Sequence, residues 1–231
     1  MKQYDISKPL ISIHIPKCAG TSFIEVLNTW FKKVYFHYPN EKRGKAPKQH
    51  KLTHGLLKKR PIESLCIHGH FNNARGYGVS DYYPEIDQFI TILRDPFDIH
   101  ISVYRHLKSR GARAHRDGAR VTKATDENYD IIKHITNARS YIMQFLPREI
   151  NINNYKEIIE QNFVYIGITE DLQNSVNVLA RRLGHEAVVV PKKNISTHHE
   201  DIPSGLREEF ILNNPLEYAI YNYALERYMT P

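Results

Sequence analysis

The chain has 231 residues and carries 32 Lys and Arg against 25 Asp and Glu, which gives a net charge of +7. With 41% hydrophobic and 25% charged residues it has the composition of a globular protein, which excludes low-complexity disorder, collagen and coiled coil. No apolar run approaches the roughly 20 residues of a membrane span, and no signal peptide is recognisable. Cys18 and Cys66 match neither a disulfide framework nor a zinc site. We therefore expect a cytoplasmic protein.

The first predicted elements are a strand, a tight loop and a helix. Residues 10–15 (LISIHI) form a short apolar run rich in β-branched residues, which is typical of a buried strand. Pro16–Gly20 breaks this run, and from Thr21 onward apolar residues recur at helical spacing. We expect Thr21 or Ser22 to be the N-cap of that helix.

The next stretch is polar and basic. We interpret Lys32–Arg60 as an exposed excursion that contains at most a short helix. A second short strand is predicted at Ser64–His68, and Asn72–Asp81, with its two glycines, is predicted as a loop.

Phe89–Leu93 (FITIL) is the clearest of the later strands. Arg94-Asp95-Pro96 ends it, and because proline is well tolerated at the first helical position we predict a helix from Pro96 to about Lys108. The remaining predicted elements are a basic loop at Gly111–Asp126, helices at Tyr129–Phe145 and Tyr155–Gln161, a strand at Phe163–Ile168, a helix at Glu170–Leu183 ending at Gly184, a loop at Pro191–Pro203, and helices at Leu206–Asn213 and Leu216–Tyr228.

Strands that alternate with helices predict an α/β fold with a mainly parallel central sheet. We expect one domain over residues 1–231, with basic insertions near 32–60 and 109–126. Ligands of such sheets bind at the carboxyl ends of the strands. Two loops lie at such ends, Pro16–Ser22 and Arg94–Pro96.

The loop between the first strand and the first helix has the composition of an anion site. The amides at a helix N-terminus point outward with the positive end of the helix dipole, and the small residues Ala19 and Gly20 let an anion approach them. Lys17 adds a positive charge, and Thr21 and Ser22 add hydroxyl donors. An ordinary strand-to-helix turn is the alternative. A Walker A loop is absent, because no G-K-[ST] occurs in the chain.

The second motif is Arg94-Asp95-Pro96, with Ser102 eight positions after Arg94. Arg94 at a strand end and Ser102 about two turns into the following helix could reach one phosphate, the arginine by paired hydrogen bonds. The alternative is that Arg94 pairs with Asp95 or caps the sheet.

The third motif is His68-Gly69-His70, directly after a predicted strand. Alternate side chains of an extended segment face the same way, so both rings could point into one cleft. A neutral imidazole is a natural general base near pH 7. Surface histidines and a metal site are the alternatives, although no further ligand has diagnostic spacing.

Together, these motifs resemble the sulfotransferases that use 3′-phosphoadenosine 5′-phosphosulfate (PAPS). The segment HIPKCAGTS is similar to the family's 5′-phosphosulfate loop, and TILRDPFDIHISVYRHL to its 3′-phosphate motif. The later segments YIGITEDLQNSVNVLARRLG and NPLEYAIYNYALERY are also similar to family segments. The H-G-H tripeptide resembles the heparan sulfate and uronyl 2-O-sulfotransferase branch. No membrane anchor like that of Golgi relatives is recognisable, so we expect a soluble, bacterial-type member.

The resemblance implies a P-loop-like three-layer fold and a set of site residues. Lys17 would lie on the phosphosulfate bridge, and Arg94 and Ser102 would hold the 3′-phosphate. His70 would be the base, with His68 supporting or replacing it. The whole cofactor loop is Pro16, Lys17, Cys18, Ala19, Gly20, Thr21 and Ser22. Cys18-Ala19 departs from the family's commoner Thr-Gly or Ala-Gly pair.

The implied reaction moves the sulfuryl group of PAPS to a hydroxyl, with 3′,5′-ADP as product and no metal required. The net charge favours an anionic partner, and a glycan acceptor fits the resembled branch better than nucleic acid. The oligomeric state is left open, and recruitment to a membrane glycan-assembly system is compatible with a cytoplasmic protein. The alternatives are a P-loop-like nucleotide kinase or hydrolase, and a non-catalytic polyanion-binding module.

Overall fold

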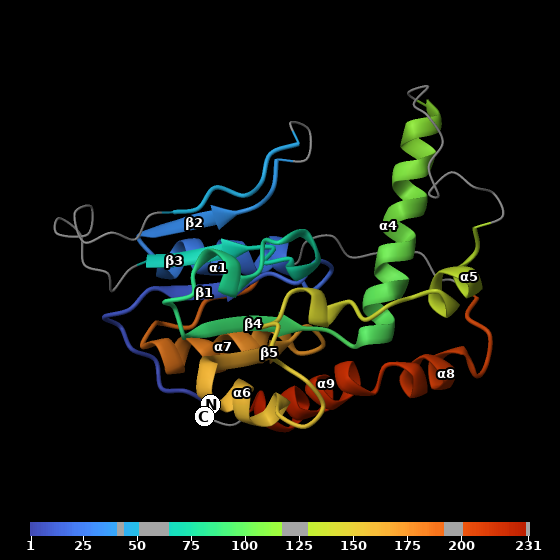
Figure 1. Cartoon of the computed structure of the whole chain (residues 1–231). Helices are drawn as coiled ribbons and strands as arrows, with labels where there is room; N and C mark the ends of the chain where they lie inside the picture. The colour runs from blue at the N-terminus through green and yellow to red at the C-terminus, as the bar shows by residue number, and fades with distance from the viewer. Residues whose placement is uncertain (41–43, 51–64, 117–128, 192–200, 230–231) are drawn as a thin grey trace.

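The computed structural model of the chain describes residues 1–40, 44–50, 65–116, 129–191 and 201–229, and of residues 110–116 only the backbone. Its centre is a sheet of five parallel strands in the order β2-β3-β1-β4-β5 (Figure 1). The strands are β1 (Leu10–Ile13), β2 (Lys33–His37), β3 (Leu65–Gly69), β4 (Phe89–Leu93) and β5 (Phe163–Ile168). The predicted α/β class is confirmed, and the sheet is entirely parallel in the part of the chain described.

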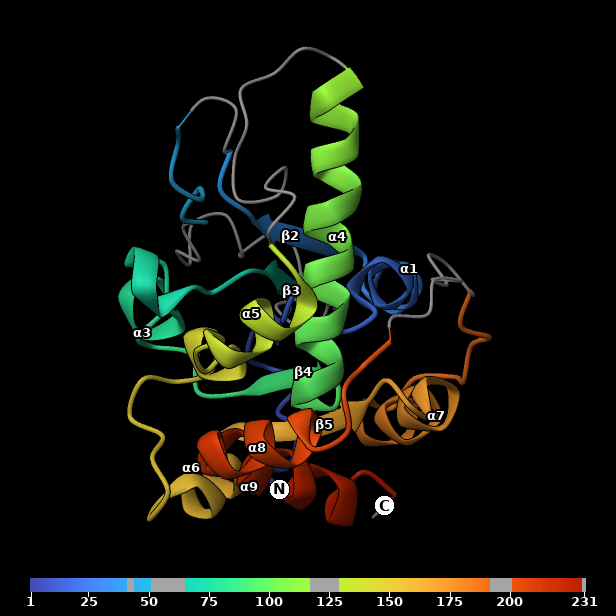
Figure 2. The same cartoon turned by 90° about the vertical axis from the view of Figure 1, so that its right-hand side faces the viewer.

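Helices cover both faces of this sheet. They are α1 (Gly20–Trp30), α3 (Val79–Tyr82), α4 (Pro96–Arg116), α5 (Ile131–Thr136), α6 (Tyr155–Asn162), α7 (Leu172–Leu183), α8 (Leu206–Asn213) and α9 (Pro215–Arg227), with 3-10 helices at Asn73–Arg75 and Ile142–Gln144. Figure 2 shows α1 and α7 on one side of the sheet, with α5, α6, α8 and α9 on the other. Of the helices described, none is both long and apolar enough to cross a bilayer.

Two apolar layers separate the sheet from its helices. On the α1/α7 side, Phe23 and Leu27 of α1 and Leu179 of α7 pack against Leu10 and Ile90 of the central strands. On the other side the neighbouring strand residues, which point the opposite way, pack under α4, α6 and α9. Because parallel strands are buried on both faces, β1, β4 and β5 are buried at every position and mostly apolar, without alternation.

Several predicted boundaries are confirmed. The strands at Phe89–Leu93 and Phe163–Ile168 and the helix at Leu206–Asn213 have the predicted limits. Pro96 opens α4, as expected for proline in the first helical turn. Gly184 ends α7 with a φ of 73°, a left-handed conformation that glycine adopts without strain.

The type or extent of four predicted elements is wrong in the described residues. The stretch Lys32–Arg60 holds strand β2, whose partly exposed residues give no apolar run. Residues 111–116, predicted as loop, continue α4. Of the predicted helix Tyr129–Phe145, only α5 and a 3-10 turn are helical, because the chain leaves α5 at Asn137. Part of Asn72–Asp81 is helical rather than loop. The parts of these predictions at 41–43, 51–64 and 117–128, and residues 192–200 of the predicted loop Pro191–Pro203, lie outside the described residues.

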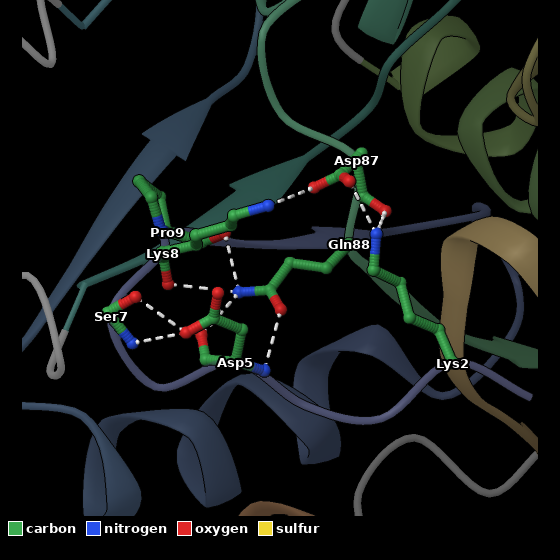
Figure 3. Close-up of polar contacts among 7 residues, drawn as sticks. All are labelled: Lys2, Asp5, Ser7, Lys8, Pro9, Asp87 and Gln88. Atoms are coloured by element: carbon green, nitrogen blue, oxygen red, sulfur yellow. Dashed lines mark hydrogen bonds and ion pairs between the residues drawn. The ribbon is translucent and has the colours of Figure 1, made fainter.

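The N-terminal segment is fixed to the start of β4 by one buried amide side chain (Figure 3). Gln88 is 0% exposed, and its Nε2 donates to the carbonyl oxygens of Asp5, Lys8 and Pro9 at 2.9–3.0 Å. Its Oε1 accepts from the amide of Asp5 at 3.1 Å. Since all four partners are backbone groups, this side chain substitutes for strand pairing at the amino edge of the sheet.

We expect Gln88→Leu to lower the free energy of unfolding by about 1–3 kcal/mol, because buried backbone groups of the N-terminal segment lose their partner. Urea denaturation measures this value. The matched control is Asp87→Asn next to it, which removes exposed ion pairs with Lys2 and Lys8 and should cost less than about 1 kcal/mol. Equal stability of Gln88→Leu and the unchanged protein would contradict the assignment.

Candidate active site

The carboxyl ends of three adjacent strands bring the three predicted motifs to one edge of the sheet. Ile13 of β1 lies opposite Gly69 of β3 on one side and Thr91 of β4 on the other. The Thr91 hydroxyl donates to the Ile13 carbonyl at 2.9 Å, and the His14 amide donates to the Gly69 carbonyl at 2.8 Å. The loop after β1 therefore lies between the segment that follows β3 and the segment that follows β4.

The loop after β1 has a strained, compact backbone. Lys17 and Ala19 have φ values of 72° and 53°, in the left-handed region that non-glycine residues rarely occupy. Helix α1 begins at Gly20, with Ala19 rather than the predicted Thr21 or Ser22 as its N-cap and without a side-chain cap. The first amides of a helix have no intrahelical partner, so those of Gly20 and Thr21 are directed at the space beyond the helix end. This is the geometry of an anion site.

The residues of this loop differ in exposure. Lys17, Pro16 and Ala19 are partly buried, and Thr21 is exposed. Cys18, Gly20 and Ser22 are buried, and burial raises the pKa of the Cys18 thiol. That thiol also faces the backbone amide of Arg94. Cys18 is therefore a packing residue between the loop after β1 and the turn after β4.

Lys17 and Arg94 are close enough for their positive charges to repel each other. Burial lowers the pKa of Lys17, and the nearby charge of Arg94 lowers it further. Neither side chain forms an ion pair within the described part of the chain. Two like charges without a carboxylate are unfavourable until an anion binds between them, so the arrangement is complementary to a multiply charged anion.

Other residues hold the turn that carries Arg94. The carboxylate of Asp95 accepts from Arg207 of α8 at 3.0 Å and from the Tyr218 hydroxyl at 3.3 Å. The Asp95 amide donates to Glu170 at 2.9 Å. The alternative in which Arg94 pairs with Asp95 is not observed, because no ion pair joins the two side chains in the described residues. Ser102 lies two turns into α4 and is partly exposed.

The two histidines of the H-G-H motif have different environments. His68 is 1% exposed on β3, and its Nδ1 lies 2.9 Å from the Ser12 hydroxyl. Burial lowers the pKa of His68 to about 3, so the ring is neutral at physiological pH. His70 lies just beyond the strand, is only partly buried, and its amide donates to the His37 carbonyl at 3.0 Å. Of the two side chains, only that of His70 is partly exposed, and its Nε2 atom is itself buried.

Gly69 explains why the motif reads H-G-H. A Cβ on residue 69 would overlap with the carbonyl group of His37 on the neighbouring strand β2. Any side chain at this position would push β2 and β3 apart. The close backbone contact between these strands therefore determines where His70 leaves the sheet.

Two further residues at this site were not predicted as functional. The ring of His14 lies 4.5 Å from that of His70 and 5.1 Å from that of His68, measured between centroids. The hydroxyl of Tyr38, just after β2, lies 2.8 Å from Nδ1 of His14. His14 belongs to the motif HIPKCAGTS and could have been singled out there. Tyr38 lies in a stretch that gave no strand signal, so no sequence pattern pointed to it.

Despite the three adjacent imidazoles, no group of three or more His, Cys, Asp or Glu side chains among the described residues could hold a metal ion. The arrangement instead offers two cations, outward-pointing amides and a partly exposed imidazole. These groups are suited to binding a phosphate or sulfate ester and removing a proton beside it.

Comparison with known proteins agrees with this chemistry. A family model described as the sulfotransferase family matches residues 4–223, which is nearly the whole chain and includes the loop after β1, the H-G-H motif and the turn of Arg94. A search of curated proteins finds no match.

The Cβ position of residue 20 predicts a coupling between Gly20 and His14. A Cβ on Gly20 would overlap with the ring of His14, so Gly20→Ala should lower the free energy of unfolding by about 1–3 kcal/mol. In the His14→Ala background the same substitution should be neutral or slightly stabilising, because alanine is the better helix former. A double-mutant cycle in urea measures this coupling. Additive effects of the two substitutions would show that the ring and the glycine are not in contact.

Proposed function

Because the chain belongs to the sulfotransferase family, we propose that it transfers the sulfuryl group of PAPS to a hydroxyl of a carbohydrate acceptor, within a single domain over residues 1–231. The observation that carries this proposal is the pair Lys17 and Arg94, two adjacent cations without a carboxylate partner in the described residues, beside the open amides of α1. PAPS supplies an activated sulfuryl group on a doubly phosphorylated adenosine. Its 3′-phosphate and its 5′-phosphosulfate are both attached to one ribose, so two neighbouring cationic turns suit them.

The loop after β1 is assigned to the 5′ end of the donor. The amides of Gly20 and Thr21, together with the hydroxyls of Thr21 and Ser22, provide donors in fixed positions. Lys17 stabilises the negative charge that develops on the bridging oxygen as the sulfuryl group leaves. Preorganised donors directed at developing charge are usually the largest single contribution to catalysis. Pro16, Cys18 and Ala19 shape the loop, and the buried Cys18 packs it against the turn of Arg94.

The turn after β4 is assigned to the 3′-phosphate. Arg94 supplies two parallel N–H donors, which match the geometry of a phosphate, and Ser102 adds a hydroxyl from α4. Asp95 is neutralised by Arg207, so its carboxylate does not oppose anion binding at Arg94.

His70 is the proposed general base. It removes the proton from the acceptor hydroxyl as that oxygen attacks the sulfur in line with the leaving group. His68 supports it: a ring that is 1% exposed does not reach an acceptor, but it fills the space beneath His14. The choice between the two histidines, which the sequence leaves open, therefore favours His70.

The acceptor is expected on the side of the sheet edge where α4 projects beyond the strands (Figure 1). The described segment 44–50, which follows β2, carries Lys45 and Lys48 and no acid, and α4 adds Arg105 and Lys108. The two carboxylates at the base of α4, Asp95 and Asp98, are both engaged by Arg207. A positive field on both sides of the site favours an anionic glycan over a neutral small molecule.

Ligand-induced stabilisation tests the donor assignment. We expect 3′,5′-ADP to raise the thermal midpoint of the chain, whereas ATP with Mg²⁺ should have a smaller effect, because a ligand that binds only the native state stabilises it. Arg94→Ala should abolish most of the shift. The control Arg148→Ala, an exposed arginine paired with Asp81, should keep it. A larger shift with ATP and Mg²⁺, or with heparin alone, would reject the proposal in favour of a nucleotide hydrolase or a polyanion-binding module.

His70→Ala tests the base. We expect the initial rate of sulfuryl transfer from PAPS to desulfated heparan or dermatan oligosaccharides to fall about 10²–10⁴-fold, since a positioned base contributes that much. The thermal shift with 3′,5′-ADP should stay unchanged, because His70 lies on the acceptor side. A variant that retains its transfer rate would remove His70 from the mechanism, and one that loses the 3′,5′-ADP shift would place it in the donor site instead.

A further inference from the structure

His14 has no role in the proposal above, yet it lies at the centre of the site. Its ring tip, Nε2, occupies the space where a Cβ of Gly20 would be, directly at the amino end of α1. On the other side, its ring contacts His70 with 4.5 Å between centroids. His14 therefore lies between the anion loop and the proposed base.

The orientation of this ring is fixed from two directions. It stacks on His68 with an interplanar angle of 15°, and His68 is itself held by the Ser12 hydroxyl. Nδ1 of His14 lies 2.8 Å from the hydroxyl of Tyr38. With Nδ1 occupied by Tyr38, Nε2 is the nitrogen left to interact with a ligand.

The direction of the hydrogen bond between Tyr38 and His14 is linked to which nitrogen of His14 carries the proton. Burial raises the pKa of Tyr38, so its hydroxyl keeps its proton and is able to donate it to Nδ1. Burial lowers the pKa of His14 to about 2, which leaves the ring neutral with one proton. If the Tyr38 hydroxyl donates to Nδ1, the single proton of the His14 ring is on Nε2. The Nε2–H then points to the amino end of α1.

We propose that Tyr38 is a positioning residue that holds His14 as an Nε2–H donor, and that this N–H binds an oxygen of the transferred sulfuryl group. This inference rests on the proposed function. We assign the sulfuryl group, rather than another part of PAPS, because His14 contacts His70. A base must lie next to the hydroxyl that attacks the sulfur, so a residue in contact with the base is near the sulfuryl oxygens. A neutral donor also suits this place, because a third positive charge would add to the repulsion between Lys17 and Arg94.

Tyr38 also contacts the proposed base itself. Its ring meets that of His70 edge to face, with 4.7 Å between centroids and an interplanar angle of 82°. Tyr38→Phe keeps this ring contact and removes only the hydroxyl. The substitution therefore separates the effect on His14 from any packing effect on His70.

The test compares the binding of PAPS, which carries the sulfuryl group, with that of 3′,5′-ADP, which lacks it, by titration calorimetry without acceptor. We expect His14→Phe, which keeps a flat ring against His68, to weaken PAPS about 10–100-fold and 3′,5′-ADP less than about 2-fold, because hydrogen bonds to charged groups are strong. Tyr38→Phe should weaken PAPS in the same selective way. The control is Tyr155→Phe on α6, which should leave both affinities unchanged.

A spectroscopic measurement accompanies the titration. The ¹⁵N shifts of His14 should show the proton on Nε2 in the unchanged protein and a mixture of tautomers in Tyr38→Phe. A proton on Nδ1 in the unchanged protein, or PAPS affinity that neither substitution changes, overturns the inference. Equal losses for PAPS and 3′,5′-ADP also overturn it, since they place His14 on the 5′-phosphate. If the unchanged protein binds neither compound, the proposed function fails instead.

Discussion

The parallel pairing of β1 with β3 on one side and β4 on the other is the constraint on which the site depends. Residues 17, 70 and 94 are far apart in the sequence, and they meet only because Ile13 lies in register between Gly69 and Thr91. Two hydrogen bonds beyond the ladder, from Thr91 and from the His14 amide, secure this register at the carboxyl edge. A shift of one residue would turn alternate side chains to the opposite face and separate the motifs.

The site is built around a local electrostatic cost. Lys17 and Arg94 repel each other, and the backbone at Lys17 and Ala19 is strained. The rest of the fold offsets this cost: Cys18 is buried beneath the loop, and Arg207 takes up the carboxylate of Asp95 that would otherwise pair with Arg94. A site that is unfavourable without its anion binds that anion more tightly than one relaxed in its absence, because binding relieves the repulsion.

Sequence reasoning recovered the parts of the fold whose signal is local. The apolar runs of β4 and β5 show buried parallel strands with the correct limits, since both faces of these strands are covered. Edge strand β2 was not predicted. Four of its five residues are exposed or partly exposed, with Phe36 at 46%, so its sequence shows neither an apolar run nor clean alternation. The N-cap of α1 was misplaced because the loop uses backbone geometry at Ala19 instead of a side-chain cap.

The same distinction applies to the site. The sequence predicts that Lys17, Arg94 and the H-G-H motif lie at one edge of the sheet, because each motif follows a strand. It does not predict that Asp95 pairs with Arg207, since Arg207 comes from a helix more than a hundred residues later. The role of Tyr38 could not be predicted for a similar reason: its contact with His14 depends on the pairing of β2 with β3.

The missed strand β2 therefore has consequences for the chemistry. Its last residue, His37, presents a carbonyl so close to β3 that only glycine fits at residue 69. That carbonyl also accepts the amide of His70 at 3.0 Å, which fixes where the proposed base leaves the sheet. One residue later the same strand delivers Tyr38 to His14 and His70. The edge strand thus fixes where His70 leaves the sheet and supplies Tyr38 to His14, whereas the central strand places the anion loop, so the pairing of β2 with β3 aligns the base with the donor site.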